Sequence, residues 1–376
     1  MSKHGGGGTV SDVLESMEAI APLRYAAEWD NVGLLAGRPE WPVRRLLLAI
    51  DLTDAVATEA LRKEVDALIV YHPPIFKGIC AITPTAESPT TLLPDLLAKR
   101  ISILAWHTAL DAAVGGTNDI LLDIFEPVSR EPLEQLVTPG EHYKLVVFAL
   151  AREVAALRRA LASQGAGVIG HYSECSFELA GQGTFHGDET TNPTVGARQV
   201  LERADEIRLE MVVPRARLGA VVRALYASHS YEEPAYDLYP VHVTPWRAMV
   251  GMGRIGMLRR PQRGEALIRK LASLVDLSGA MVVGKLKRSF RSVTAAAGAF
   301  GIKSFTDPRS LVVTGEFKHH DALELEKRGV TAVHLGHYAS ERPALEVLHQ
   351  KLARRLKGVR VAIARRDCAP LRRIEE

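Results

Sequence analysis

The chain has 376 residues, of which 47% are hydrophobic and 24% charged, so it can bury more than one core, and we expect two or three domains. The formal net charge of +3 gives no electrostatic case for nucleic-acid binding, and the three isolated cysteines disfavour a disulfide framework. No apolar stretch is long enough to span a bilayer, so we expect a cytoplasmic protein without a membrane partner.

The N-terminal third predicts strands that alternate with helices. Apolar runs at residues 46–50, 66–72 and 101–107 are typical of buried strands. Residues 51–54 are expected to supply capping groups for a helix that continues to about residue 64, and a second helix is expected over residues 91–99. Strands joined by helical crossovers are parallel, so their C-terminal ends lie on one edge of the sheet. His72 and His107 end two of these strands and are therefore expected to face one crevice.

The middle of the chain predicts a domain of another kind. A strand at 143–148, a helix near 155–161, an alternating strand at 207–213, a helix at 218–226 and an extended segment at 236–240 fit a β-α-β-β-α-β pattern. We therefore expect a ferredoxin-like domain at 140–243, inserted between an N-terminal lobe (1–135) and a C-terminal lobe (244–376). Residues 251–256 fit G-x-G-x-x-G, but no amphipathic helix follows, which favours a glycine-rich strand or turn.

The C-terminal third repeats the alternating plan. Strands are predicted at 310–315 and 331–335, with a helix at 319–328 between them, and Ser340 is expected to cap a last helix with Glu341 in its first turn. His337 and Glu341 then lie on a strand-to-helix corner. The expected fold class is α/β: two α/β lobes with mixed sheets form one metal-binding unit, interrupted by the ferredoxin-like domain.

Three segments far apart in the chain place a histidine at a strand end with carboxylates nearby. Any one of these histidines alone is more simply a structural or capping residue, but the three together favour a metal site. Imidazole and carboxylate ligands without cysteine favour Zn, Mn or Fe. Two such ions can share a carboxylate and a hydroxide, which is the arrangement of many hydrolytic centres.

Five motifs, at residues 28–35, 71–76, 107–111, 314–321 and 336–341, occur in the order of a known family. They resemble the dinuclear-metal proteins called GTP cyclohydrolase I type 2 homologues, or NGG-one-interacting-factor-three-like proteins. The middle segment is similar to the inserted domain of the longer bacterial members, which is related in fold to the P-II and CutA proteins. The resemblance covers both outer lobes.

The resemblance implies metal ligands at His72, Asp111, His337 and Glu341, with Glu341 bridging two divalent ions. It makes Glu341 and His337 the residues nearest the reaction. Tyr71 stands where many bacterial members carry histidine, so it removes one expected ligand unless its phenolate coordinates.

Two further histidines, His107 and His320, are secondary candidates that either bind metal or orient a ligand. The favoured hypothesis is a metal-dependent hydrolase of a small, nucleotide-like molecule. The alternatives are a non-catalytic metal-binding regulator with the inserted domain as sensor, and an interaction scaffold that the metal only stabilises. The resemblance also implies a homo-hexamer, a trimer of dimers whose sites face an internal cavity.

Overall fold

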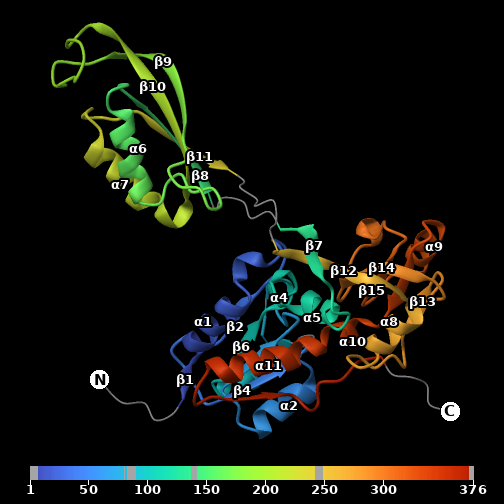
Figure 1. Cartoon of the computed structure of the whole chain (residues 1–376). Coiled ribbons are helices and arrows are strands. Elements are labelled where there is room, and N and C mark those ends of the chain that lie inside the picture. Colours follow the sequence, from blue (N-terminus) through green and yellow to red (C-terminus); the bar gives the residue numbers. More distant parts are fainter. Residues whose placement is uncertain (1–6, 80, 83–89, 137–141, 242–248, 372–376) are drawn as a thin grey trace. The chain divides into compact units, whose positions relative to one another are not determined.

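The computed structural model describes residues 7–79, 81–82, 90–136, 142–241 and 249–371. The chain forms two compact units (Figure 1). One consists of Met1–Leu136 and Arg247–Glu376, and the other of Val137–Trp246. Within the described residues, no helix is both long and apolar enough to cross a membrane.

The first unit contains two sheets, and we name each lobe after its sheet. The sheet of the N-terminal lobe has the order β17-β4-β5-β6-β2, in which the first four strands are parallel and β2 is antiparallel to β6. Strand β5 is buried throughout, as expected of a strand covered on both faces. The strands are β2 (Gly33–Ala36), β4 (Arg45–Ala49), β5 (Ala67–Val70), β6 (Ser102–Ala105) and β17 (Arg360–Ile363).

Helices pack on both faces of this sheet. Apolar side chains of α1 (Val10–Ile20), α4 (His107–Ala112) and α11 (Pro343–Arg355) share one core cluster. Those of α2 (Asp54–Arg62) and α3 (Leu93–Ala98) belong to the other. A two-stranded ribbon, β1 (Gly8–Thr9) with β3 (Pro42–Val43), completes the lobe.

The sheet of the C-terminal lobe has the order β13-β16-β15-β14-β12-β7. Strands β14, β15 and β16 are parallel neighbours, and the outer pairs are antiparallel. Helices α5 (Thr117–Asp123) and α8 (Gly264–Leu271) contribute to one core, and α9 (His319–Lys327) contributes Leu325 to a second. The strands are β7 (Ser129–Gln135), β12 (Gly251–Arg263), β13 (Met281–Val283), β14 (Ser289–Ala296), β15 (Ser310–Thr314) and β16 (Thr331–His334).

The two lobes exchange elements of the chain. Helix α11 and strand β17, from the end of the sequence, pack into the N-terminal lobe, whereas α5 and β7 from the first third join the C-terminal lobe. The expected fold class, two α/β lobes with mixed sheets, is confirmed. Membership of the two sheets nevertheless does not follow a single boundary in the sequence, because these pairings join distant parts of the chain.

The buried side chain of Arg254 in β12 contacts elements of both lobes. This side chain is fully buried, and its Nε donates to Asp119 of α5 at 3.0 Å. Its Nη2 donates to the carbonyl oxygens of Ala112 and Ala113, which follow directly after Asp111. The glycine-rich stretch around it is a strand, as predicted, and carries no dinucleotide-type turn into a helix.

The second unit is a four-stranded antiparallel sheet with the order β11-β8-β10-β9. Chain order and strand order together are those of the ferredoxin-like β-α-β-β-α-β plan. Helices α6 and α7 contact each other and supply buried residues to the core. The elements are β8 (His142–Ala149), α6 (Val154–Ser163), β9 (Phe177–His186), β10 (Leu201–Pro214), α7 (Leu218–Ser228) and β11 (Tyr236–Val241).

Candidate metal centre

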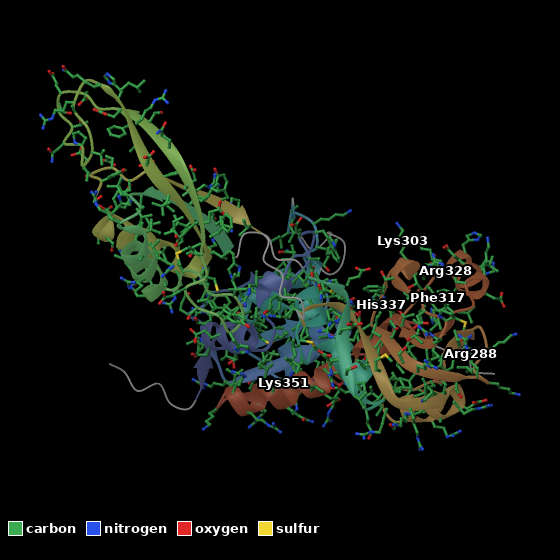
Figure 2. All side chains as sticks on the ribbon, turned by 45° about the horizontal axis from the view of Figure 1, so that its top comes forward. Arg288, Lys303, Phe317, Arg328, His337 and Lys351 are labelled. Carbon is green, nitrogen blue, oxygen red and sulfur yellow. The ribbon has the colours of Figure 1, made fainter. Side chains whose placement is uncertain are left out.

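Three side chains converge where the two lobes of the first unit meet. His72, His337 and Glu341 each offer a ligand atom, and these atoms lie within 4.8 Å of one another. The two imidazoles face each other with 3.3 Å between their Nε2 atoms. The Glu341 carboxylate places Oε1 3.1 Å from His337 Nε2 and Oε2 3.2 Å from His72 Nε2. His337 is labelled in Figure 2.

Local backbone geometry brings these residues together. His72 comes after β5, separated from it by Tyr71, and the His72 amide donates to the Ile50 carbonyl beyond β4, which continues the hydrogen bonding between these two strands. On the other lobe, Gly336 has a φ of +89°, a turn that glycine adopts without strain, and α10 (His337–Glu341) begins after it. One turn of helix puts positions i and i+4 on one face, so His337 and Glu341 lie side by side.

The expected cap at Ser340 is wrong. The helix begins at His337, and the Ser340 hydroxyl lies inside it, where it donates to the His337 carbonyl at 2.7 Å and accepts the Gly298 amide at 2.9 Å. The predicted strand-to-helix corner is present, but Gly336, rather than Ser340, precedes its short helix, and the last helix, α11, follows Arg342. Ser340 therefore links the corner to the loop after β14.

Each imidazole of the cluster is oriented by a further carboxylate. His72 Nδ1 lies 2.9 Å from Asp51, and His337 Nδ1 lies 3.2 Å from Glu316. A metal-ligating histidine is commonly held in this way through its second nitrogen. The predicted capping of α2 from residues 51–54 is confirmed, because Thr53 caps the helix and accepts the amide of Val56. Sequence reasoning missed Asp51 and Glu316 as partners of the histidines, although each lies shortly after a buried strand, as the histidines do.

The electrostatics of the cluster favour a cation. Burial opposes protonation of His72, but hydrogen bonds to Asp51 and Glu341 outweigh it and raise the pKa of His72 to about 10. The hydrogen bond to Glu341 raises the pKa of His337 to about 9, although burial opposes the shift. The Glu341 Oε2 atom is buried and accepts no well-aligned hydrogen bond, although His72 lies within ion-pair range. This donor set, with a buried oxygen left unsatisfied, fits a divalent ion bound by two imidazoles and a carboxylate.

Gly298, in the loop after β14, lies against the cluster. Its φ is +64°, and a Cβ atom there would lie 2.5 Å from Glu341 Oε1 and 3.5 Å from His337 Nε2. The segment after β15 also lies against this loop, because the Glu316 amide donates to the Gly298 carbonyl at 3.0 Å. The backbone of this loop therefore forms one wall of the centre, and only glycine leaves room for the carboxylate.

Asp111 and Tyr71 lie beside the cluster but outside the group of three. The Tyr71 hydroxyl donates to Asp111 Oδ1 and lies 2.8 Å from the hydroxyl of Thr117. Burial and the negative charges of Asp111 and Glu341 raise the pKa of the Tyr71 phenol, so the hydroxyl keeps its proton. Burial and the charge of Glu341 also raise the pKa of Asp111 to about 6. Tyr71 thus acts as a hydrogen-bond donor to Asp111 rather than as a phenolate.

The two secondary histidines have different positions. The ring of His107 lies 5.2 Å from that of His72, and its Nδ1 lies 3.1 Å from the carboxylate of Asp30. Burial raises the pKa of Asp30, but hydrogen bonds from His107 and Thr108 outweigh it and lower the value to about 2. His107 is therefore next to the cluster, and a carboxylate holds its Nδ1 atom, as it does in His72 and His337. His320 is exposed on α9, outside the cluster of three, with its ring against His319.

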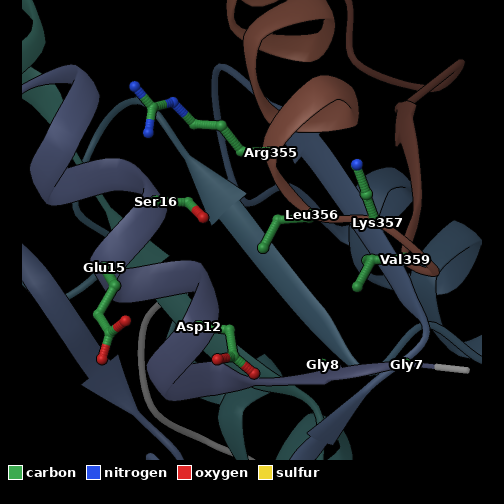
Figure 3. Close-up of a pocket in the computed structure, with 9 residues that line it drawn as sticks. All are labelled: Gly7, Gly8, Asp12, Glu15, Ser16, Arg355, Leu356, Lys357 and Val359. Atoms are coloured by element: carbon green, nitrogen blue, oxygen red, sulfur yellow. The ribbon is translucent and has the colours of Figure 1, made fainter.

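A separate surface hollow of about 570 Å³ lies at the start of α1 and the end of α11 (Figure 3). Acidic Asp12 and Glu15 line one side, and basic Arg355 and Lys357 the other. The Asp12 carboxylate already accepts the amide and hydroxyl of Thr9 as part of a helix cap. None of the three cluster residues lines this hollow, so it is distinct from the candidate centre.

A family model described as Duf34/NIF3 (NGG1p interacting factor 3) matches residues 8–370. The chain belongs to this family. It is 33% identical over 366 residues to the Bacillus subtilis protein named GTP cyclohydrolase 1 type 2 homolog, which covers 95% of this chain and 96% of that protein. The family resemblance inferred from the five motifs is confirmed.

Solved structures give the same result for the NIF3 fold. A Bacillus cereus protein related to NIF3 superposes with a TM-score of 0.70 at 29% identity, over 99% of this chain and 100% of that one. A Staphylococcus aureus protein superposes with a TM-score of 0.75 at 22% identity, over 97% and 99%, and this likeness supports the fold alone. The motif histidines His72 and His337 therefore lie on a fold shared with NIF3-related proteins.

Proposed function

We propose that this NIF3 family protein is a metal-dependent hydrolase of a small, nucleotide-like molecule. The observation that carries the proposal is the cluster of His72, His337 and Glu341, with each imidazole held from behind by a carboxylate. A bound divalent ion would lower the pKa of a coordinated water and supply a nucleophile near neutral pH. The residues of this chain would hold the ion, orient both rings and keep the Glu341 carboxylate away from bulk water.

The ligand set proposed from the sequence adds Asp111 and a second ion that shares Glu341. Tyr71 donates to Asp111 Oδ1, so an ion bound by Asp111 would compete with this hydrogen bond, and this second position should bind more weakly than the first. Metal analysis of purified protein should then find close to one tightly held ion per chain. Tyr71→His should add an imidazole ligand and raise the amount of bound metal, and an unchanged amount would argue against Asp111 as a ligand.

An exposed pair of aromatic rings beside the centre supports a substrate that carries a planar ring. Trp29 is 63% exposed and Phe76 49% exposed, and their ring centroids lie 6.0 Å apart. Trp29 also lies 6.0 Å from the ring of His107. The side-chain amide of Asn31 donates to the Ile75 carbonyl at 2.5 Å, which ties together the two loops that carry these rings. Exposed aromatic faces of this kind stack on planar rings, nucleobases included.

The decisive experiment assays metal-loaded, full-length protein against a panel of nucleotides and of phosphoesters that lack a planar aromatic ring. Glu341→Ala should abolish turnover while the circular dichroism spectrum is retained. Glu346→Ala is the matched control, because this glutamate lies on the neighbouring helix with its side chain 62% exposed. Trp29→Ala should raise KM for nucleotides and leave KM for ribose 5-phosphate unchanged.

The outcome separates this proposal from its alternative. Tight metal binding without turnover of any substrate would instead support the non-catalytic, metal-binding regulator. The hexameric assembly and the cytoplasmic location expected from the sequence stay predictions, and light scattering of the purified protein tests the first of them.

A further inference from the structure

A second candidate site lies in the ferredoxin-like unit. Fifteen residues there line a pocket of about 400 Å³. The walls come from the end of β9, the loop that joins β9 to β10, and residues 231–235 before β11 (Figure 1). The volume lies within the range of pockets that bind small molecules, which is roughly 300–1,000 Å³.

The loop that covers the pocket is fixed by hydrogen bonds to the opposite wall. The amide of Asn192 donates to Glu232 Oε1 at 2.8 Å, and the hydroxyl of Thr194 donates to the Ser230 carbonyl at 2.7 Å. At the base of the loop, the amide of Gln199 donates to the Gly187 carbonyl at 2.7 Å. Because these contacts join the two walls, the pocket is formed before any ligand enters.

The lining combines aromatic rings with carboxylates. Phe148, Phe185 and Tyr231 supply the rings. Three glutamates supply negative charge, and none of the fifteen described lining residues is lysine or arginine; the glutamates are Glu206, Glu232 and Glu233.

One of these carboxylates is held in a defined position. The Tyr231 hydroxyl donates to Glu206 Oε1 at 2.8 Å. The other oxygen, Oε2, lies over Gly183, where an added Cβ would be only 2.1 Å away. Gly183 therefore provides the space that Glu206 occupies, and any larger residue there would displace the carboxylate.

This chemistry selects one class of ligand. Carboxylates in a lining that has no lysine or arginine among its described residues attract a cation, and aromatic faces attract cations and apolar groups alike. A bare metal ion fits less well, because Glu206 and Glu232 already accept hydrogen bonds and the described carboxylates here do not form a three-ligand group. We propose that this pocket binds a small organic amine, with its ammonium group against the glutamates and its apolar body against the rings. The site is separate in sequence and chemistry from the metal centre.

The test uses isothermal titration calorimetry on full-length protein with three probes of similar size. Phenethylamine carries a positive charge, phenethyl alcohol is neutral and hydrocinnamate is negative. Phenethylamine should bind at least about tenfold more tightly than the other two, because only the amine forms a charge-assisted contact with carboxylate. Glu206→Gln should weaken phenethylamine binding about tenfold.

Glu178→Gln is the matched control, because it removes the same charge from β9 outside the pocket lining and should leave binding unchanged. Glu233→Gln removes an exposed rim carboxylate and provides a second variant if Glu206→Gln fails to fold. Equal affinity for the three probes would overturn the proposal, as would the absence of phenethylamine binding at millimolar concentration. Glu206→Gln and Glu233→Gln proteins that bind phenethylamine as Glu178→Gln does would overturn it as well.

Discussion

The two lobes of the first unit build their halves of the candidate metal centre by the same rule but with different side chains. In the N-terminal lobe, Asp51 follows β4 and His72 follows the parallel neighbour β5. In the C-terminal lobe, Glu316 comes just after β15 and His337 just after the parallel neighbour β16. Each lobe therefore offers an imidazole together with the carboxylate that orients it, from adjacent parallel strands at one sheet edge.

The lobes differ in what else lies at that edge. The N-terminal lobe continues to β6 and presents a third imidazole, His107, whereas the C-terminal lobe presents the bare backbone of Gly298 after β14. Each lobe continues into a short helix that adds a carboxylate four residues after a histidine, Asp111 in α4 and Glu341 in α10, but only Glu341 belongs to the cluster of three. The N-terminal lobe thus supplies one imidazole of the cluster and a further imidazole beside it, and the C-terminal lobe supplies the second imidazole, the cluster carboxylate and the space for that carboxylate.

The first prediction breaks the fixed relation between the lobes. Arg254→Leu removes the fully buried one of the two arginines that contact the Asp119 carboxylate, Arg130 being the other, and it removes the hydrogen bonds to the carbonyls after Asp111. We expect the free energy of unfolding to fall by about 3–5 kcal/mol. Urea denaturation measures the change, with the exposed Arg260→Leu on the same strand as control. The double variant with Asp119→Leu should recover part of the loss, and no recovery would show that the hydrogen bonds from Arg254 to the end of α4, rather than its ion pair with Asp119, account for the loss.

The second prediction concerns the wall that only the C-terminal lobe has. Gly298→Ala places a Cβ 2.5 Å from Glu341 Oε1 in a backbone conformation that alanine rarely adopts. The carboxylate must move, so we expect metal affinity to fall by about 100-fold. Chelator competition measures it. Gly301→Ala is the control, because a Cβ there has nothing within 4 Å. Equal affinities for the two variants would mean that the loop does not confine Glu341.

The local features of the candidate centre are predictable from the sequence, whereas its long-range contacts are not. Each cluster histidine closely follows an apolar run, and the helical spacing of His337 and Glu341 is local, so all three cluster residues were found. The role of Gly298 depends on an atom 43 positions away, and that of Asp51 on a neighbouring strand. The α/β class was readable from alternating patterns, but the pairing of β17 with β4 was not, because parallel pairing of distant segments leaves no local signal.

The third prediction compares the two orienting carboxylates directly. Asp51→Asn and Glu316→Gln each remove the charge behind one imidazole, which should lower metal affinity by about 10–100-fold. Asp51 should matter more, because it lies 2.9 Å from its histidine against 3.2 Å for Glu316 and its side chain is less exposed. Asp54→Asn, in the first turn of α2, is the control. A larger effect at Glu316 would reverse the ranking of the two lobes.

The smallest change in the free energy of unfolding is expected where α2 contacts the segment after β17, near the end of the chain. The carboxylate of Glu59 on α2 accepts the amides of Arg365 and Arg366, just after β17, and pairs with Lys63 at 2.5 Å. Burial opposes ionisation, but the hydrogen bonds from Lys63 and from the two amides outweigh it and hold the pKa of Glu59 below its usual 4.5. Because the pKa of Glu59 is lower in the folded protein than in the unfolded chain, the ionised carboxylate stabilises the fold at pH values above 4.5. This stabilisation is lost as the pH falls through the lowered pKa.

Glu59→Gln should therefore reduce the free energy of unfolding by about 1–2 kcal/mol at neutral pH. The difference from the unmodified protein should shrink as the pH falls below 4.5, because the native carboxylate then takes up its proton. Urea denaturation at several pH values measures this, with Glu64→Gln as the exposed control. A difference that stays constant with pH would mean that the shape of the side chain, rather than its charge, ties the last strand to α2.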